Sequence, residues 1–446
     1  MERPREMQPV SAESAVVAAP AHLTGTANST LEALPAVIIL NLFYTGIAIA
    51  RDLAGRGVRI VGLTAHRNSP GNRTRLCEVR FSPNSHEQPD ELVEFLLKAS
   101  SELSGAVIFP TRDLDVLFLD RYRDVLGRHY RLAIPDRESL YRVIDKYALA
   151  CIAQKADLPV PKTMTIRSEC ELRQVPNQIG FPCVMKPVSS YQWREGENWD
   201  VVGGRKAFLV ESMEMLAQEY EMVRHAHQEV LVQEWVPGGT ENIVVIGAYV
   251  GANAEPLAYF TARKIVQSPD EYFGTGCIVR SEDIPELLEP TRRLWKALDY
   301  RGMAEVEYKF DPRSNEYKLI EINTRHWDQH ELGRASGVNL SWSAYADLTG
   351  IEATTKKVAT VGTTWIGEDA LIRHVLEGFY RGKIELKKLW KQLQGPRIYG
   401  IFSWRDPVPF MHHCATVTVP ALAKQFLRSF TKNGSRDEPV VAKVKK

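Results

Sequence analysis

Residues 302–330 read GMAEVEYKFDPRSNEYKLIEINTRHWDQH and carry the clearest structural pattern in the chain. Two runs in which polar and apolar residues alternate, 304–310 and 317–323, flank the turn-forming residues 311–315. Alternation with a period of two is typical of β-strands, and a short turn of this composition joins antiparallel neighbours. The stretch therefore predicts a β-hairpin.

The predicted hairpin carries charge on one face. Because successive side chains of a strand point to opposite faces, Glu305 and Glu307 share a face of the first strand. Glu321, Asn323 and Arg325 share a face of the second strand for the same reason. Carboxylate and amide oxygens suit Mg²⁺, and a neighbouring guanidinium can hold a phosphoryl or carboxylate group. A charged strand face that is merely solvated would show the same pattern, so the hairpin alone leaves both interpretations open.

The composition predicts a globular chain of two to three domains, since 446 residues with 44% hydrophobic and 25% charged residues can build substantial cores. The net charge of +1 argues against bulk nucleic-acid binding. The six cysteines form no Cys-x-x-Cys pair, so neither a zinc site nor a disulfide framework is predicted. No apolar run reaches the roughly 18 residues of a membrane span and no signal-type core follows the N-terminus, so we expect a soluble, cytoplasmic protein.

Glu307 before the turn and Glu321-Ile322-Asn323-Thr324-Arg325 after it resemble the metal-binding end of the ATP-grasp superfamily. The resemblance covers residues 35–350 and includes several separated motifs in family order. It implies an α/β chain in which a Rossmann-like domain precedes an ATP-grasp fold, whose two α+β subdomains clasp ATP. The expected parts are a disordered tail (1–33), a pre-ATP-grasp domain (34–140), an ATP-grasp domain (141–350, hinge near 232–241) and a helical or irregular extension (351–446).

The N-terminal domain is also predicted from its own residues. Residues 37–63 read as strand, helix and strand, which is a βαβ opening. No GxGxxG follows the first strand, so a dinucleotide site has little support. Arg112 and Asp113 follow the predicted strand 106–109, where ligands bind in open α/β sheets, although helix capping would explain both residues equally well.

The resemblance also assigns the nucleotide contacts. One lysine at a helix start and one at the end of the strand in 180–187 are expected to contact phosphates, because fixed cations neutralise phosphate charge. The strand and turn at 230–241 correspond to the hinge that binds adenine and ribose in an apolar slot. The implied nucleotide contacts are Lys146, Lys186, Gln233, Glu234, Val236 and Glu241, and the implied ligands of Mg²⁺ or Mn²⁺ are Glu307, Glu321 and Asn323.

The loop 188–205 follows the second phosphate-binding lysine. Its serines and glycines suit a lid whose backbone N–H groups approach phosphates. Trp193 and Trp199 depart from the shorter, more glycine-rich loops of the family, and they would alternatively cover apolar surface. The composition therefore predicts a lid without fixing its individual contacts.

Cations beyond the lid are the expected catalytic residues. Lys264 corresponds to the family position that reaches the transferred phosphoryl group, and Arg263 and Arg280 are weaker candidates for which surface charge is the alternative. Several fixed cations would stabilise the charge that spreads over three equatorial oxygens. Arg325 is expected to stabilise the oxyanion that forms when an amine attacks.

Beyond residue 350 the resemblance weakens. Residues 365–378, 387–393 and 421–430 suggest helices around a strand at 397–404. The last of these helices is basic and amphipathic, which permits contact with a membrane surface but is also typical of a docked terminal helix. The run 412–414, His-His-Cys, has no matching ligands nearby, so no metal site is predicted there.

The resemblance implies an ATP-dependent carboxylate–amine ligase that joins its substrates through an acyl phosphate and releases ADP and phosphate. The expected ligands are ATP, Mg²⁺ or Mn²⁺, a small carboxylate and an amine, with amino acids among the candidates. A homodimer would fit, whereas no nucleic acid and no transmembrane segment are expected. The alternatives are a carboxylase-like enzyme that activates bicarbonate and a non-catalytic nucleotide sensor on the same fold.

Overall fold

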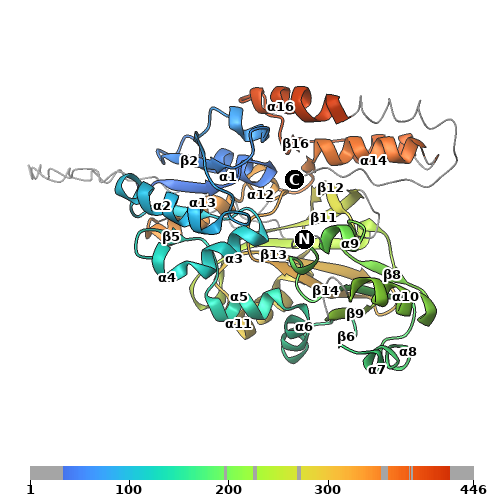
Figure 1. Cartoon of the computed structure of the whole chain (residues 1–446). Helices are drawn as coiled ribbons and strands as arrows, with labels where there is room; N and C mark the ends of the chain where they lie inside the picture. Colours follow the sequence, from blue (N-terminus) through green and yellow to red (C-terminus); the bar gives the residue numbers. More distant parts are fainter. Residues whose placement is uncertain are drawn as a thin grey trace, which may run out of the picture. The chain divides into compact units, whose positions relative to one another are not determined.

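The computed structural model describes residues 34–194, 198–224, 229–268, 273–352, 360–380, 382 and 385–421. Three β-sheets with intervening helices organise this part of the chain, and many of their elements are labelled in Figure 1. The arrangement agrees with the α/β class expected from the sequence.

The first sheet is parallel and comes from the N-terminal third of the chain. Its elements are β1 (Val37–Leu40), α1 (Tyr44–Leu53), β2 (Ile60–Thr64), β3 (Glu78–Phe81), α2 (Pro89–Leu103), β4 (Val107–Phe109), α3 (Asp113–Arg121), α4 (Arg123–Leu126) and β5 (Arg131–Leu132). The strand order is β3-β2-β1-β4-β5, and each neighbouring pair is parallel. Alternate residues of β1 enter two different apolar cores, as expected of a parallel strand covered on both faces. This arrangement is Rossmann-like.

The second sheet is antiparallel and carries the predicted second lysine. Its elements are α5 (Arg137–Ile144), α6 (Lys146–Lys155), β6 (Thr163–Ile166), α7 (Glu169–Leu172), α8 (Val175–Gln178), β7 (Cys183–Pro187), α9 (Asn198–Val201), β8 (Phe208–Val210), α10 (Met213–Val223) and β9 (Val230–Glu234). The strand order is β6-β9-β7-β8. Helix α6 begins at Lys146 because the Asp145 carboxylate accepts the backbone N–H groups of Tyr147 and Ala148. Helix capping thus fixes the start of the helix that carries this lysine.

The third and largest sheet contains the hairpin. Its elements are β10 (Ile243–Val250), β11 (Pro256–Ser268), β12 (Thr275–Ser281), α11 (Leu288–Leu298), β13 (Gly302–Asp311), β14 (Glu316–Asn323), α12 (Glu331–Ala335), α13 (Leu340–Thr349), β15 (Thr364–Ile366), α14 (Glu368–Tyr380), α15 (Leu386–Gln392), β16 (Arg397–Tyr399) and α16 (Val408–His413). The strand order is β14-β13-β10-β11-β12-β15-β16. All neighbours are antiparallel except β15 and β16, which are parallel.

The predicted hairpin is confirmed as β13 and β14. Glu305 lies opposite Asn323 and Glu307 lies opposite Glu321, so these four side chains share one face of the sheet. An irregularity after Glu307 shifts the register by one residue on the β14 side. The carboxylate row expected from the alternation is therefore present, and it lies at the β14 edge of the largest sheet.

The two faces of the largest sheet pack against different cores. Val244 and Tyr308 face one core, to which α11 contributes Trp295. Val245 and Ala262 face the other core, which also contains residues of α1 and α13. Adjacent residues of one strand therefore enter different surroundings.

The structure corrects several predicted boundaries. Residues 255–261 predict a strand, and in the structure β11 continues beyond them through Arg263 and Lys264. The predicted helix 365–378 is wrong at its start, because Trp365 lies in strand β15 and α14 begins only at Glu368. The predicted strand 397–404 is confirmed only over its first three residues. Residues 406–409 predict a turn, but in the structure helix α16 begins within them, at Val408. Apart from Ala421, the predicted helix 421–430 lies outside the described residues.

Candidate functional site

The shared face of the hairpin holds a buried carboxyl beside two partly accessible ones. Glu305 is 5% exposed, and its side chain accepts a hydrogen bond of 2.9 Å from Asn323 Nδ2. Burial, reinforced by the charge of Glu307, raises the pKa of Glu305 to about 7 even though Lys264 opposes the shift. Removal from water, more than any neighbouring charge, thus favours the protonated form of Glu305.

Three lysines from separate elements converge on these carboxylates. Lys264 of β11 forms an ion pair with Glu307 across the largest sheet. Lys146, at the start of α6, has its Nζ 4.0 Å from Glu321 and donates to Ser190 Oγ at 2.6 Å. Removal from bulk water alone would raise the pKa of Glu321, but Lys146, Lys186 and Lys264 together lower it. The predicted residues from α6, β7, β11 and β14 thus interact electrostatically.

Lys186 sits at the end of β7 in a buried position. Its Nζ donates to Gln233 Oε1 of the neighbouring strand β9 at 2.8 Å. Burial, reinforced by the charge of Lys146, lowers the pKa of Lys186 to about 8. A cation with so little hydration gains from any anion that enters, so the position suits binding of a phosphate.

Arg325 lies just past the end of β14 and pairs with Asp113, the first residue of α3. Its Nε and Nη2 donate to the two carboxylate oxygens of Asp113 at 2.7 and 3.2 Å. Burial would lower the pKa of Arg325, but the Asp113 carboxylate raises it above its usual value. A small cavity of about 30 Å³ lies here. It is lined by Asp113, Lys146, Glu321 and Asn323, and by the lid residues Ser190 and Tyr191. The Arg325–Asp113 pair therefore adjoins the cluster of carboxylates and lysines.

The predicted adenine hinge follows β9. The Glu234 side chain pairs with Arg313 and Lys318 of the hairpin, with closest distances of 2.7 and 3.2 Å. Val236 is buried, which suits an apolar slot. Glu241, the predicted ribose contact, is exposed. The Glu234 carboxylate is thus already engaged by two cations, and a nucleotide at this hinge would have to use backbone groups.

Two of the predicted cations lie away from this cluster. Arg280 points to the other face of the sheet, where it donates to Thr364 Oγ1 at 3.0 Å and to the Gln392 carbonyl at 2.6 Å. Arg263, its partner across the sheet, binds both carboxylate oxygens of Glu282 at 2.7 Å. We therefore leave both arginines out of the candidate site.

Sequence reasoning missed Lys309. This lysine is 7% exposed on the face that carries Glu305 and Glu307, and its Nζ lies 4.2 Å from the ring centre of Trp235 in the hinge. Burial lowers the pKa of Lys309 to about 8. The alternation along β13 contained the signal, because Lys309 is two residues beyond Glu307.

A buried polar network lies behind Arg325, and no local sequence pattern indicates it. The Ser341 hydroxyl donates to Asp52 at 2.7 Å and accepts from His326 Nε2 at 3.0 Å. Burial lowers the pKa of His326 well below its usual value, so this ring is neutral. The His326 carbonyl in turn accepts from Arg325 at 3.0 Å. The network orients the segment that carries Arg325, and we assign His326 this positioning role.

The predicted lid divides into a packed part and a part next to the lysines. Trp193 is 1% exposed and packs edge to face against Phe208, with 5.4 Å between ring centres. The alternative that this tryptophan covers apolar surface is therefore confirmed. Ser190 binds Lys146, as described above, and Lys206 donates to Thr275 at 2.9 Å. Residues 195–197 of the lid lie outside the described part of the chain.

The donor set at the hairpin fits a divalent cation. Glu307 and Glu321 offer carboxylate oxygens on the same face, and Asn323 donates to Glu305 through its nitrogen, which leaves its amide oxygen to accept. Such oxygen donors suit Mg²⁺, which is usually bound by one or two carboxylates plus phosphates and water. Within the described residues, no group of three or more His, Cys, Asp or Glu side chains is arranged to hold a metal ion.

All six cysteines are free, and no described helix is long and apolar enough to cross a membrane.

Comparison with known proteins supports this assignment of the fold. A family described as carbamoyl-phosphate synthase L chain, ATP binding domain, matches residues 275–345, which include the hairpin. D-aspartate ligase from Enterococcus faecium is 25% identical over 285 residues, which cover 61% of this chain and 66% of that ligase. D-alanine–D-alanine ligase from Ectopseudomonas mendocina is 25% identical over 185 residues, which cover 41% and 55%. The chain thus spans about half to two thirds of the length of these curated relatives.

Solved structures agree with the sequence relatives. Biotin carboxylase from Campylobacter jejuni, in complex with β-γ-ATP, superposes with a TM-score of 0.58 at 15% identity and covers 74% of each chain. Sheets, hairpin and charged face together define an ATP-grasp fold. The chain shares this fold with ATP-grasp proteins, and the curated proteins that it resembles in sequence are named as ligases and synthases.

Proposed function

We propose that this protein is an ATP-dependent carboxylate–amine ligase that works through an acyl phosphate. The observation that carries the proposal is the convergence of Lys146, Lys186 and Lys264 on the carboxylates of Glu307 and Glu321. Fixed cations facing oxygen ligands are what phosphoryl transfer requires, because its transition state spreads charge over several oxygens. The ligase names of the sequence relatives support the same class of reaction.

The nucleotide is proposed to bind between the second sheet and the hairpin. Lys146 and Lys186 would contact the phosphates, and the Gln233 side chain holds Lys186 in place by their hydrogen bond of 2.8 Å. The backbone at Glu234 and Val236 would contact the adenine, and the Glu241 carboxylate would bind the ribose. The relative solved as a complex with β-γ-ATP supports a nucleotide ligand.

A magnesium ion is proposed at the hairpin face, held by Glu307, Glu321 and Asn323. When bound there, the ion would neutralise phosphate charge next to Lys264. Lys264, which forms an ion pair with Glu307 on this face, would contact the transferred phosphoryl group.

The reaction follows from these positions. A carboxylate oxygen of the first substrate attacks the γ-phosphorus, the bond to the β-phosphate oxygen breaks, and ADP leaves. The unprotonated amine then attacks the acyl carbon, phosphate leaves, and the nitrogen loses a proton to give the amide. Arg325 stabilises the oxyanion of this second step, and the carboxylate of Asp113 offers a site for an ammonium group of a substrate. A zwitterionic amino acid would satisfy both members of the Arg325–Asp113 pair.

Trapping of the acyl phosphate tests the proposal. With ATP, Mg²⁺ and one carboxylate at a time, hydroxylamine should yield a hydroxamate and ADP in the absence of any amine. Amino acids, short peptides and hydroxy acids form the panel of carboxylates. ADP release only when an amine is present, with no hydroxamate from any carboxylate of the panel, would reject the stepwise mechanism.

A bicarbonate-activating enzyme is the second candidate, because a biotin carboxylase shares the fold at a TM-score of 0.58. Bicarbonate would then stimulate ADP release without any other carboxylate. A nucleotide sensor is distinguished in the same assay, since it would bind ATP without turnover. The domain boundaries at residues 34, 141 and 350, a homodimer and a cytoplasmic location remain proposals.

A further inference from the structure

Helix α15 leaves part of its apolar surface uncovered. Leu389 and Leu393 pack against the small core that contains Val266 and Ile278. Leu386 and Trp390, which lie four residues apart on a neighbouring stripe of the helix, are 64% and 69% exposed. One apolar stripe thus attaches the helix to the protein, and the other is left at the surface.

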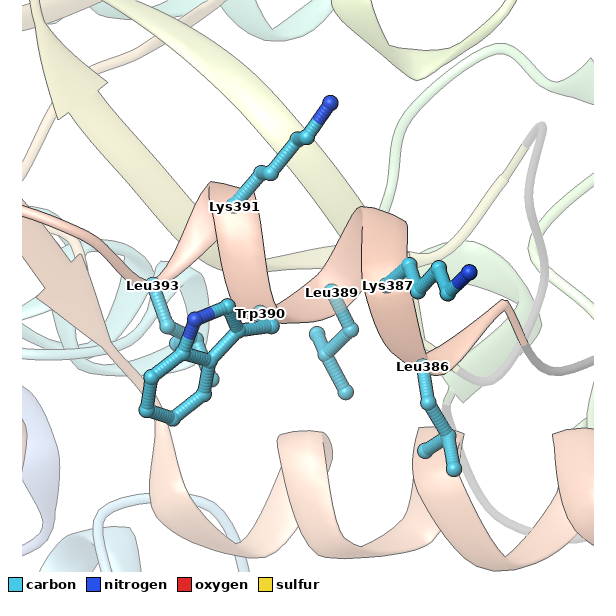
Figure 2. A pocket seen from close by; sticks show the side chains of 6 residues that line it. All are labelled: Leu386, Lys387, Leu389, Trp390, Lys391 and Leu393. Atoms are coloured by element: carbon cyan, nitrogen blue, oxygen red, sulfur yellow. The ribbon is translucent and has the colours of Figure 1, made fainter.

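The exposed stripe borders an open hollow of about 540 Å³, shown in Figure 2. Leu386, Leu389 and Trp390 extend to one side of the helix, whereas Lys391 extends to the opposite side. Exposure of a tryptophan and a leucine to water is unfavourable in free energy, because each side chain has a large apolar area. The stripe is therefore a candidate interaction surface.

Positive charge surrounds this stripe. Lys387, Lys388 and Lys391 are all exposed on α15. The stretch 386–405 contains five Lys or Arg residues and no Asp or Glu. An apolar stripe with Trp and Leu beside a row of lysines is the composition of helices that lie on membrane surfaces, where Trp sits at the headgroup level.

We propose that α15 is a contact site for the surface of a membrane that contains anionic lipids. Leu386 and Trp390 enter the headgroup region, and Lys387, Lys388 and Lys391 contact the lipid phosphates. The proposal is independent of the proposed ligase reaction. It concerns peripheral contact, and it complements the finding that no described helix could span a bilayer.

Charge argues against the two other occupants of this surface. A second copy of the chain would bring the same lysines against each other, and like charges at close range repel. Residues 422–446, which follow the described part, contain seven Lys or Arg and two acidic residues, so their charge has the same sign as that of α15. Anionic lipid is the occupant whose charge is opposite.

Vesicle co-sedimentation of the full chain tests the proposal. The protein should sediment with vesicles of phosphatidylcholine and phosphatidylglycerol at low salt, but not with phosphatidylcholine alone. A triple variant should lower the partition coefficient by about 100-fold; it combines Lys387→Gln, Lys388→Gln and Lys391→Gln. Each lysine near an anionic surface increases the partition coefficient roughly fivefold. Salt at about 0.5 M should weaken binding of the wild type, since it shortens the Debye length.

Matched variants separate this contact from its alternatives. Trp390→Ser should reduce vesicle binding, whereas Phe81→Ser, at a residue 59% exposed on β3, should not. Failure of the wild type to bind anionic vesicles would overturn the proposal. A second result would also overturn it: the double variant Lys424→Gln, Arg428→Gln loses vesicle binding while the α15 variants still bind. In that case residues 422–446 would carry the contact. A dimer in light scattering that Trp390→Ser dissociates would assign the surface to a second copy.

Discussion

Arg263 and Lys264 are adjacent cations on β11, yet they lie in different surroundings. Lys264 points to the face with Glu305 and Glu307, where burial would lower its pKa and the two carboxylates raise it. Arg263 points to the opposite face and pairs with Glu282, whose side chain is 41% exposed. The first pair lies in a buried cluster of further carboxylates and lysines, whereas the second is a separate ion pair near solvent. The side of the strand, more than the residue type, decides which cation is available to a ligand.

The strongest test of this comparison removes one charge from the functional face. Glu321→Gln should lose ATPase and ligase activity while the protein stays folded, because it neutralises a proposed metal ligand. Removal of a residue that only orients a metal ligand lowers activity by up to about 100-fold. We expect the loss of activity in Glu321→Gln to be larger. Turnover is measured by ADP release with Mg²⁺ and after chelation. The control is Glu316→Gln on the exposed part of the same hairpin, and normal turnover of Glu321→Gln would reject the metal assignment.

Arg325→Met tests the boundary between the nucleotide and acceptor sides of the charged face. The change keeps an extended side chain but removes the charge that pairs with Asp113. Hydroxamate formation should fall by about 100-fold to 1000-fold, as for the loss of one fixed donor to an oxyanion. ATP affinity, measured by calorimetry, should change little. Abolished ATP binding would assign Arg325 to the nucleotide site instead.

Glu305→Gln probes the stability of the same face. The pKa of Glu305 is about 7 in the folded state, above its value of 4.5 in an unfolded chain. The unfolded state therefore loses this proton first, and stability falls as the pH rises from about 4.5 to 7. At pH 8 without metal, Glu305→Gln should be more stable than the wild type by up to about 3 kcal/mol, whereas at pH 4 the two should be similar. Urea unfolding at both pH values measures the difference, with Glu316→Gln as the control.

Lys186→Ala should weaken ADP binding by about 10-fold to 100-fold. This factor corresponds to the free energy of one hydrogen bond to a charged group. Because the pKa of Lys186 is lowered to about 8, wild-type affinity for ADP should also decrease as the pH rises through 8. The variant should lose this pH dependence. Calorimetry at several pH values tests both points, with Lys155→Ala at the exposed end of α6 as the control. Unchanged ADP affinity in Lys186→Ala would make this lysine a structural residue.

The smallest effect is expected on the opposite face. Arg280→Met should leave ligase turnover within about twofold of the wild type, since a residue remote from the reacting atoms changes free energies by about 0.5 kcal/mol. Its lost hydrogen bonds to Thr364 and Gln392 should instead lower stability by about 1 kcal/mol. A turnover loss as large as that of Arg325→Met would restore Arg280 to the catalytic set.

The sequence predicted those parts of the fold that carry a long, regular signal. The hairpin was recognised because its two strands alternate over seven or more residues around a strong turn. Strands β15 and β16 were missed or displaced because three residues are too few to show a period. The Arg325–Asp113 pair joins residues 212 positions apart, and no local pattern reports such a contact. Arg280 was included because residue type and order are visible in a sequence, whereas the face of the sheet depends on its register.

The position of β15 in the largest sheet has a consequence for synthesis on the ribosome. Strand β12 has β11 on one side and β15 on the other. Strand β15 begins at Thr364, 83 residues after β12 ends at Ser281, and Thr364 lies opposite Arg280. Until Thr364 emerges, the outer edge of β12 keeps its backbone groups unpaired, and such an edge can pair with another chain. A nascent or truncated chain that ends before β15 would therefore carry the complete charged face and an open sheet edge at the same time. Pairing with β15 covers the edge of β12 that would be open in such a chain.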